Sequence, residues 1–377
     1  MSRILGYNGW DPLREVWLGD IWPESFYSIL PNDLEDTFCK LTEYTKRDLA
    51  IIQKTFENLG VSVKRPVIEN NVNLYLDKFT GSLIKPPITP RDYCGVIGDR
   101  LFFMDNNHYY KNYNNLHQPH KTFQEGTVST WMPHLQEYIA AGEKVIFSPE
   151  AGINTAHIVR IGCDLYLDNY VSAEYHSGQL SDNRKEELWS RDLERFKRNV
   201  LPLFENEYRC HYLTNGGHAD GCLAPLRPGL LLSTHYWPDY DSTFPNWEKI
   251  AIQEPTFQNL NVNLEKRWRI PGMDNAGNLI DDYLEKNMSD WIGDFRESVF
   301  ETNLIVIDEK NIMCIGVHDK LFSLLESYGI TVHPVPHSCV SFWDGGLHCI
   351  TLDIHRDSIK KDYFPERGQF GLGMLFK

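Results

Sequence analysis

Residues 157–167, HIVRIGCDLYL, contain two short apolar runs on either side of a Gly-Cys-Asp turn. Apolar runs of this length, joined by a turn with glycine and aspartate, are typical of two paired β-strands. Comparable patterns of apolar runs and turn residues occur at residues 16–20, 95–104, 223–232 and 303–315. The sequence therefore predicts five hairpin-like strand pairs.

Stretches with the apolar spacing of helices lie between these strand pairs. They cover residues 34–59, 131–141, 189–204 and 319–328. A strand pair followed by a helix, repeated along the chain, favours a radial α/β repeat over a doubly wound sheet. An ordinary mixed α/β domain is the alternative that this pattern leaves open.

The composition is that of an ordinary globular protein. Of 377 residues, 42% are hydrophobic and 24% are charged, which excludes disordered, collagen-like and coiled-coil chains. Lys and Arg number 37 against 52 Asp and Glu, so the net charge is −15. Because phosphate binding requires clustered Lys and Arg, nucleic acid is a poor candidate partner. The acidity suits a cationic substrate, although an acidic surface can also simply be a soluble surface.

The sequence predicts a cytoplasmic protein without a membrane partner. No apolar run approaches the roughly 18–20 residues of a membrane span, and the first residues lack the apolar core of a signal peptide. The 8 cysteines include no C-x-x-C pair, which argues against a zinc site and against a disulfide framework. We expect these cysteines to be reduced, and most of them to be buried.

Residues 235–300 form a long segment that is rich in aromatic and turn residues. Segments this long inside a compact domain are often lids or binding loops. We therefore treat residues 1–377 as a single domain with an aromatic insertion around 235–300. A surface insertion that packs only on itself is the alternative.

The motif NGGHADG, residues 215–221, offers a candidate acid/base pair. His218 and Asp220 are two residues apart, so they would project the same way from an extended strand. The histidine could then move protons while the aspartate holds a positive charge beside it. A structural or metal-binding use of the same two residues is the alternative.

Two further motifs contain candidate functional residues. Cys349 follows a Gly-Gly turn in GGLHC, residues 345–349, where a nucleophilic thiolate could be presented. A lone cysteine is more often a buried apolar side chain. Asp92, at the end of TPRD, could bind a cationic substrate, but it could equally cap a turn.

These motifs together resemble the glycine amidinotransferase family of the guanidino-group-modifying (pentein) superfamily. The resemblance rests on YNGWDPLREV at residues 7–16, PRD at 90–92, HAD at 218–220 with RPGLLLS at 227–233, the strand 303–309, and GGLHC at 345–349. The motifs occur in the family's order across nearly the whole chain. The resemblance implies an α/β fold that is a five-bladed propeller with pseudo-fivefold repeats.

The resemblance also implies roles for individual residues. Cys349 matches the nucleophile and His218 the general acid/base, whereas Asp92 and Asp220 match the carboxylates that bind a substrate guanidinium. Asn215 matches a polar residue on the acceptor side, and Gly217 replaces a larger residue of the glycine-using enzymes, which would widen the acceptor pocket.

Three positions depart from the family pattern. His157 stands at the third catalytic position, where the family has an aspartate that orients the histidine. Either His157 orients His218 through a neutral imidazole, or Asn154 or Glu150 replaces it. Trp237 falls near the family's carboxylate-binding arginine, and Pro86 stands where the family has a tyrosine.

The implied activity is transfer of the amidino group of L-arginine, through a covalent cysteine intermediate, to an amine acceptor with release of ornithine. No metal or organic cofactor is implied. Within the family, the sequence is similar to enzymes of secondary-metabolite, saxitoxin-like toxin biosynthesis, and a homodimer is the family expectation. An arginine deiminase-type hydrolase that gives citrulline and a catalytically silent binding protein are the alternatives.

Overall fold

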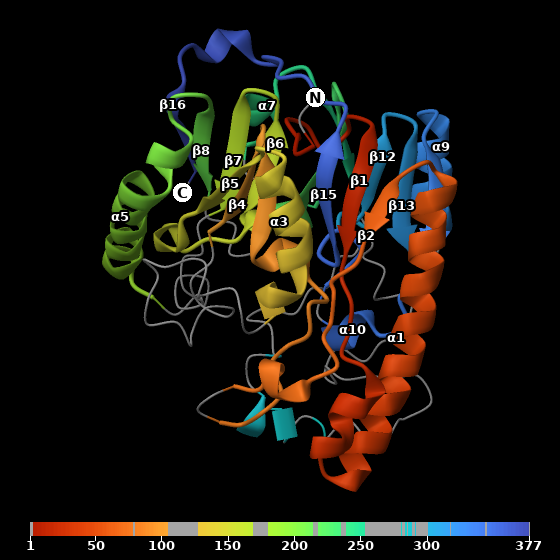
Figure 1. Ribbon diagram of the computed structural model, residues 1–377. Coiled ribbons are helices and arrows are strands. Elements are labelled where there is room, and N and C mark those ends of the chain that lie inside the picture. The colour runs from red at the N-terminus through yellow and green to blue at the C-terminus, as the bar shows by residue number, and fades with distance from the viewer. Residues whose placement is uncertain are drawn as a thin grey trace.

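The computed structural model describes most of the chain (Figure 1). The described residues are 3–77, 80–104, 127–168, 180–213, 218–234, 239–252, 280, 283, 284, 286–288, 291, 301–316, 318–343 and 345–376. Figure 1 shows the labelled helices α1, α3, α5 and α9 on the outside of the strands.

The described strands form five separate sheets that share one motif. In each sheet, two strands pair antiparallel and a third strand runs parallel to the second. The sheets are β15 (Thr351–Arg356), β1 (Leu13–Leu18) and β2 (Ser62–Lys64); β3 (Cys94–Ile97), β4 (Arg100–Phe103) and β5 (Lys144–Phe147); β6 (Ile158–Ile161), β7 (Asp164–Asp168) and β8 (Arg209–Leu213), extended by β16 (Gly371–Leu375); β9 (Leu223–Arg227), β10 (Leu230–Ser233) and β11 (Glu248–Ala251); and β12 (Ile305–Asp308), β13 (Asn311–Ile315) and β14 (Thr331–Val335). We call β15, β3, β6, β9 and β12 the lead strands.

Four of the predicted hairpins are confirmed, and the first is wrong. Gly98, Gly162 and Gly229 adopt positive φ in three of the hairpin turns, where glycine is favoured. At residues 16–20 no hairpin forms, because the chain after Gly19 continues without a return strand. Instead, β1 pairs with β15 from the far end of the sequence. Gly19 is needed there for space, since a Cβ atom would lie 1.9 Å from the carbonyl oxygen of Ile88.

The four predicted helices are confirmed, three of them with ends within two residues of the predicted bounds, whereas the helix predicted over residues 189–204 begins seven residues earlier and ends five residues earlier. They are α1 (Asn32–Asn58), α3 (Met132–Ala140), α5 (Asp182–Asn199) and α9 (Asp319–Ser327). In the chain, each of these helices lies between the second and third strands of a sheet. These two strands are parallel, and parallel strands need a crossover connection of this kind. Shorter helices are α6 (Ala219–Cys222), α7 (Tyr240–Thr243) and α10 (Val340–Trp343).

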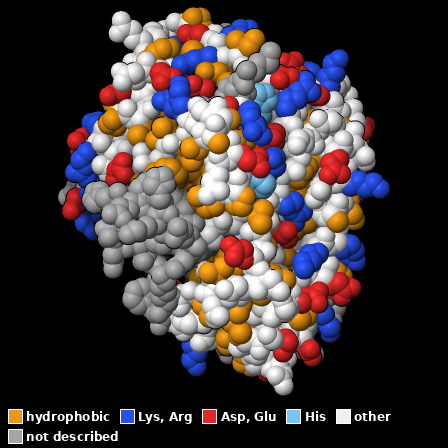
Figure 2. All heavy atoms as spheres, in the orientation of Figure 1, with side chains coloured by type: hydrophobic (Ala, Val, Ile, Leu, Met, Phe, Trp, Pro, Cys, Tyr) orange, Lys and Arg blue, Asp and Glu red, His pale blue; other side chains and the backbone are white. Residues whose placement is uncertain are grey.

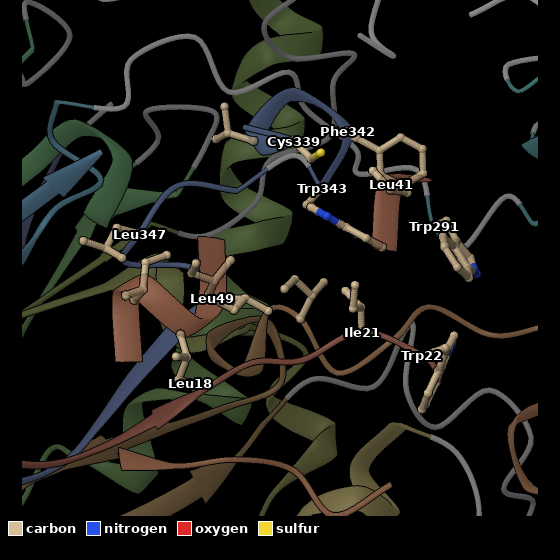
Figure 3. Packing of buried hydrophobic residues seen from close by; sticks show 14 of the residues in the cluster. Leu18, Ile21, Trp22, Leu41, Leu49, Trp291, Cys339, Phe342, Trp343 and Leu347 are labelled. Carbon is tan, nitrogen blue, oxygen red and sulfur yellow. The ribbon is translucent and has the colours of Figure 1, made fainter. Parts of the chain in front are cut away.

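The largest apolar cluster fixes the segment that leads to Cys349. The buried face of α1 includes Leu41 and Leu49, which pack in one cluster with Trp343 and Leu347 (Figure 3). The indole Nε1 of Trp343 also donates a hydrogen bond of 3.0 Å to the Thr45 hydroxyl of α1. Fully burying side chains of this kind stabilises a fold by about 1.5–3 kcal/mol each. The chain segment that precedes Cys349 is therefore anchored in the core.

Part of segment 235–300 lies within the described residues, and that part packs in the core. Residues 239–252 supply α7 and β11, so they complete the fourth sheet. Trp291 is buried beside α1, where its Nε1 donates a hydrogen bond of 2.8 Å to the carbonyl oxygen of Leu83. Residues 253–279 and 292–300, on which the lid prediction mainly depends, are outside the described residues.

The described part of the face in Figure 2 carries both signs of charge. On the face in Figure 2, Lys and Arg side chains are interspersed with Asp and Glu, so the net charge of −15 is not gathered into one patch there. Among the helices that the structure describes, none is long and apolar enough to cross a membrane.

Candidate active site

Short segments with polar side chains stand directly before all five lead strands. Asp92 precedes β3, His157 precedes β6, His218 and Asp220 precede β9, Asn303 precedes β12, and Cys349 precedes β15. The short 3-10 helices Pro90–Asp92 and Thr155–His157 pack together, the second also contacts α6, and the first also contacts β15. The fold therefore gathers these segments at the starts of the lead strands.

Cys349 is buried, with 2% of its surface exposed, and its sulfur is held by a side-chain amide. The Nδ2 group of Asn303 donates to Cys349 Sγ over 3.0 Å. The Oδ1 atom of Asn303 accepts hydrogen bonds from the backbone N–H groups of His348 at 2.7 Å and Cys349 at 3.2 Å. The sequence motifs give Asn303 no role of its own, although Asn303 opens both the family-like strand 303–309 and the fifth predicted strand pair.

His218 lies against Asn154 and His157. The Asn154 Nδ2 atom is 3.4 Å from His218 Nε2, whereas His157 meets the His218 ring edge to face with 4.9 Å between ring centroids. Of the three groups considered for orienting His218, Asn154 is therefore the one at hydrogen-bond distance from a His218 nitrogen. Glu150 is exposed, and its carbonyl oxygen accepts a hydrogen bond from Asn199.

His157 is a neutral imidazole at physiological pH. Burial first, and then the nearby His218 ring, lower the pKa of His157 to about 3. Its Nδ1 atom accepts a hydrogen bond of 3.3 Å from the backbone N–H of Asn154. His157 thus packs beside His218 without supplying a fixed negative charge.

The expected strand geometry of His218 and Asp220 is wrong. Residues Ala219–Cys222 form the single turn of α6, and His218 stands at its N-terminal boundary. A turn is possible here because β9 begins only at Leu223. Asp220 is therefore buried in the turn, where its Oδ2 atom lies 2.5 Å from Nδ1 of His348.

Two site carboxylates each have one buried oxygen without a hydrogen-bond donor among the described residues. These atoms are Asp92 Oδ1 and Asp220 Oδ1. The other oxygen of Asp92 is 3.8 Å from Nζ of Lys85, beyond hydrogen-bond distance. Burial by itself raises the pKa of Asp220, but the adjacent His348 imidazole holds that pKa below its usual value. Because buried polar atoms are normally paired, these oxygens are suited to a ligand that brings donors.

A second group of charges lies further along the lead strands. Asp353 of β15 binds three guanidinium groups: Arg91 Nη2 at 2.9 Å, Arg356 Nε at 2.7 Å, and Arg160. Burial by itself raises the pKa of Asp353, but these arginines hold it well below its usual range. One pocket is lined by all three arginines together with Asp220 and His348.

Several predicted positions add no side-chain contact to the described site. Asn215, Gly217 and Trp237 are outside the described residues. Pro86 is buried, and its carbonyl oxygen accepts a hydrogen bond from the Ile88 N–H. Across the described ranges, no cluster of three or more His, Cys, Asp or Glu side chains is placed to hold a metal ion.

Comparison with known proteins gives full-length similarities. No protein-family model matches the sequence. A Streptomyces griseus protein named as an inosamine-phosphate amidinotransferase is 24% identical, and the alignment covers 96% of this chain and 99% of that protein. The mitochondrial glycine amidinotransferase of Gallus gallus is 23% identical, with 96% and 85% covered.

Two solved structures share the fold along their whole length. SxtG, an amidinotransferase from Microseira wollei in the saxitoxin biosynthetic pathway, has a TM-score of 0.60 and 18% identity, with 96% of this chain and 100% of that chain covered. The inosamine-phosphate amidinotransferase from Streptomyces griseus has a TM-score of 0.58 and 18% identity, with 96% and 99% covered. Their fold is therefore also the fold of this chain.

Proposed function

We propose that this chain is an amidinotransferase, and that it moves the amidino group of L-arginine to an amine acceptor through a covalent intermediate on Cys349. Its full-length similarity to inosamine-phosphate and glycine amidinotransferases supports this proposal. One observation carries this proposal: the buried oxygens Asp92 Oδ1 and Asp220 Oδ1 lack donors among the described residues. A guanidinium has five N–H donors, a positive charge and no acceptor. Hydrogen bonds to charged groups contribute about 1.5–3 kcal/mol each, so two carboxylates would select this group and hold it in place.

The first half-reaction is an attack by sulfur on the guanidinium carbon. The Cys349 thiolate forms an S–C bond, and the C–N bond to the ornithine nitrogen breaks. His218, as imidazolium, protonates the departing nitrogen, so ornithine leaves as a neutral amine. The amidino group remains on the sulfur, which splits one difficult displacement into two easier ones.

The second half-reaction reverses these roles. The acceptor amine attacks the amidino carbon, His218 removes a proton from the attacking nitrogen, and the S–C bond breaks to restore the thiolate. Asn154 suits both states of His218, because its side-chain amide can donate to a neutral ring nitrogen or, after rotation, accept from a protonated one. Its Oδ1 atom has no donor among the described residues.

For the acceptor we propose only a chemical class. It is a primary amine of secondary metabolism that is larger than glycine. The named relatives and fold neighbours are inosamine-phosphate amidinotransferases, a glycine amidinotransferase and a saxitoxin-pathway enzyme. Their acceptor classes are therefore the panel to test. We also propose that the five sheets are the blades of a closed propeller, and the homodimer stays a prediction.

The test is an intact-protein mass spectrum after incubation with arginine and no acceptor. We expect the wild type to gain one amidino group, Cys349→Ala to gain none, and Cys39→Ala, which changes a half-buried cysteine of α1, to behave as the wild type. Addition of a competent acceptor should then remove the group. Citrulline without an adduct would favour the deiminase-type hydrolase, and absence of both adduct and product would overturn arginine as the donor.

A further inference from the structure

We infer that Asn303 is a positioning residue that holds the Cys349 sulfur ready for attack, and that Gly346 is a glycine because Asn303 occupies its side-chain space. The inference rests on the proposed function, in which Cys349 is the nucleophile. Both side chains are buried, Asn303 at 0% and Cys349 at 2% exposed, so their contact is shielded from water.

The orientation of the Asn303 amide is determined by its neighbours. Its Oδ1 atom accepts from two backbone N–H groups, those of His348 and Cys349. Turning the amide over would place its NH₂ group against two donors, which would leave all of them unsatisfied. Nδ2 must therefore face Sγ, and at 3.0 Å the contact is a hydrogen bond from N–H to sulfur.

The Gly-Gly pair is explained by close approach rather than by a turn conformation. Neither Gly345 nor Gly346 is among the glycines with positive φ. A Cβ atom on Gly346 would lie 2.6 Å from Cγ, 2.7 Å from Oδ1 and 2.8 Å from Cβ of Asn303. Distances under 3 Å force one group to move, so any side chain at 346 would push Asn303 away from the sulfur.

The contact matters because the charge on sulfur changes during the reaction. A thiolate is the attacking form, and a fixed N–H dipole stabilises negative sulfur more strongly than a thiol or a thioether. Asn303 would therefore favour the thiolate before attack. It would also stabilise the thiolate that departs when the acceptor takes the amidino group.

The experiment measures the alkylation rate of Cys349 by iodoacetamide as a function of pH, with the modified peptide followed by mass spectrometry. Asn303→Asp keeps the acceptor but replaces the donor by an oxygen, and Gly346→Ala displaces Asn303 while both side chains stay neutral. Asn58→Asp, at the exposed end of α1, is the matched control, and Cys39 in the same sample reports any general change in reagent.

We expect Asn303→Asp to slow alkylation of Cys349 at pH 7 by at least about tenfold, because a carboxylate beside sulfur opposes the thiolate, and the rate should recover at higher pH. Gly346→Ala should slow it several-fold, and Asn58→Asp should not change it. If Asn303→Asp and Gly346→Ala are both folded and Cys349 is alkylated at the wild-type rate at every pH, the inference is overturned. If the variants slow alkylation but the wild type gains no amidino group from arginine, the inference stands and the proposed function falls.

Discussion

Buried carboxylates occur in two neighbouring regions of this molecule, and their surroundings differ. Asp353 binds guanidinium groups from three arginines of its own chain. Asp92 and Asp220, at the starts of the lead strands, each keep a buried oxygen without a donor among the described residues. The pairing of carboxylate with guanidinium is made within the chain in the first region, whereas in the second region the proposed function would have a substrate guanidinium make it. The first region should therefore control stability and the second should control recognition.

The largest effect is expected in the completed region. Asp353→Asn should lower the free energy of unfolding by about 3–5 kcal/mol, because it leaves buried arginines without their counter-charge. Urea unfolding measures this. Asp357→Asn is the matched control, because Asp357 pairs with Arg14 on the surface, where 51% of its side chain is exposed, and such pairs contribute about 0–1 kcal/mol. Equal losses in the two variants would contradict the distinction between the regions.

The next effect belongs to the open region. Asp92→Asn should raise the KM for arginine about tenfold to a hundredfold, which corresponds to the loss of roughly 1.5–3 kcal/mol of charge-assisted hydrogen bonding. Steady-state kinetics gives KM, and urea unfolding in parallel should show a much smaller loss than Asp353→Asn. An Asp92→Asn variant with an unchanged KM but a reduced free energy of unfolding would show that Asp92 serves stability and not arginine binding.

His157 should make the fold sensitive to acid. Its pKa is lowered to about 3 in the folded state, so the unfolded chain binds a proton that the folded chain does not. The stability that His157 contributes is therefore complete above pH 6.5 and falls as the pH drops from about 6.5 towards 3, by up to about 1.4 kcal/mol per pH unit. Unfolding curves of His157→Gln at several pH values should fall less steeply than those of the wild type, and parallel curves would reject this account.

The smallest effect tests how His218 is oriented. Asn154→Asp places a negative charge beside His218, which favours the protonated ring. On the high-pH side of the profile, the pH at which kcat/KM has fallen to half its maximum should move upward by about one pH unit relative to the wild type. Asn199→Asp is the matched control, because the Asn199 side chain donates to the carbonyl oxygen of the exposed Glu150 and accepts from Arg198, and it should leave the profile in place. A profile unmoved by Asn154→Asp would argue that Asn154 does not act on His218.

Local patterns made much of this fold predictable. The hairpins around Gly98, Gly162 and Gly229 combine a glycine turn with flanking apolar runs, all within about a dozen residues. The hairpin predicted at residues 16–20 is wrong because the neighbour of β1, β15, lies more than 300 residues away and no local signal connects the two strands. The two-residue spacing of His218 and Asp220 predicts a strand, but the same spacing also fits the helical turn that Asp220 occupies.

The sequence predicted candidate residues for the site, but few of their contacts. Motifs pointed to Cys349, His218, Asp220 and Asp92, and the structure places each of them directly before a lead strand. Their roles stay predictions. The contacts of Asn303 could not be read in the same way, since its amide meets a sulfur 46 residues further along the chain. The spacing of residues 154–157 likewise did not reveal which side chain would reach His218, because that depends on how the 3-10 helix turns.

The pairing of β1 with β15 has a consequence for synthesis on the ribosome. β1 is made first, yet its antiparallel neighbour is among the last strands to emerge, and such distant pairing is slow to form. Cys349 stands directly before β15, so its sulfur receives the Asn303 contact only at that late stage. If Cys349 is the nucleophile, as proposed, the nascent chain would carry no assembled nucleophile until the first sheet is completed.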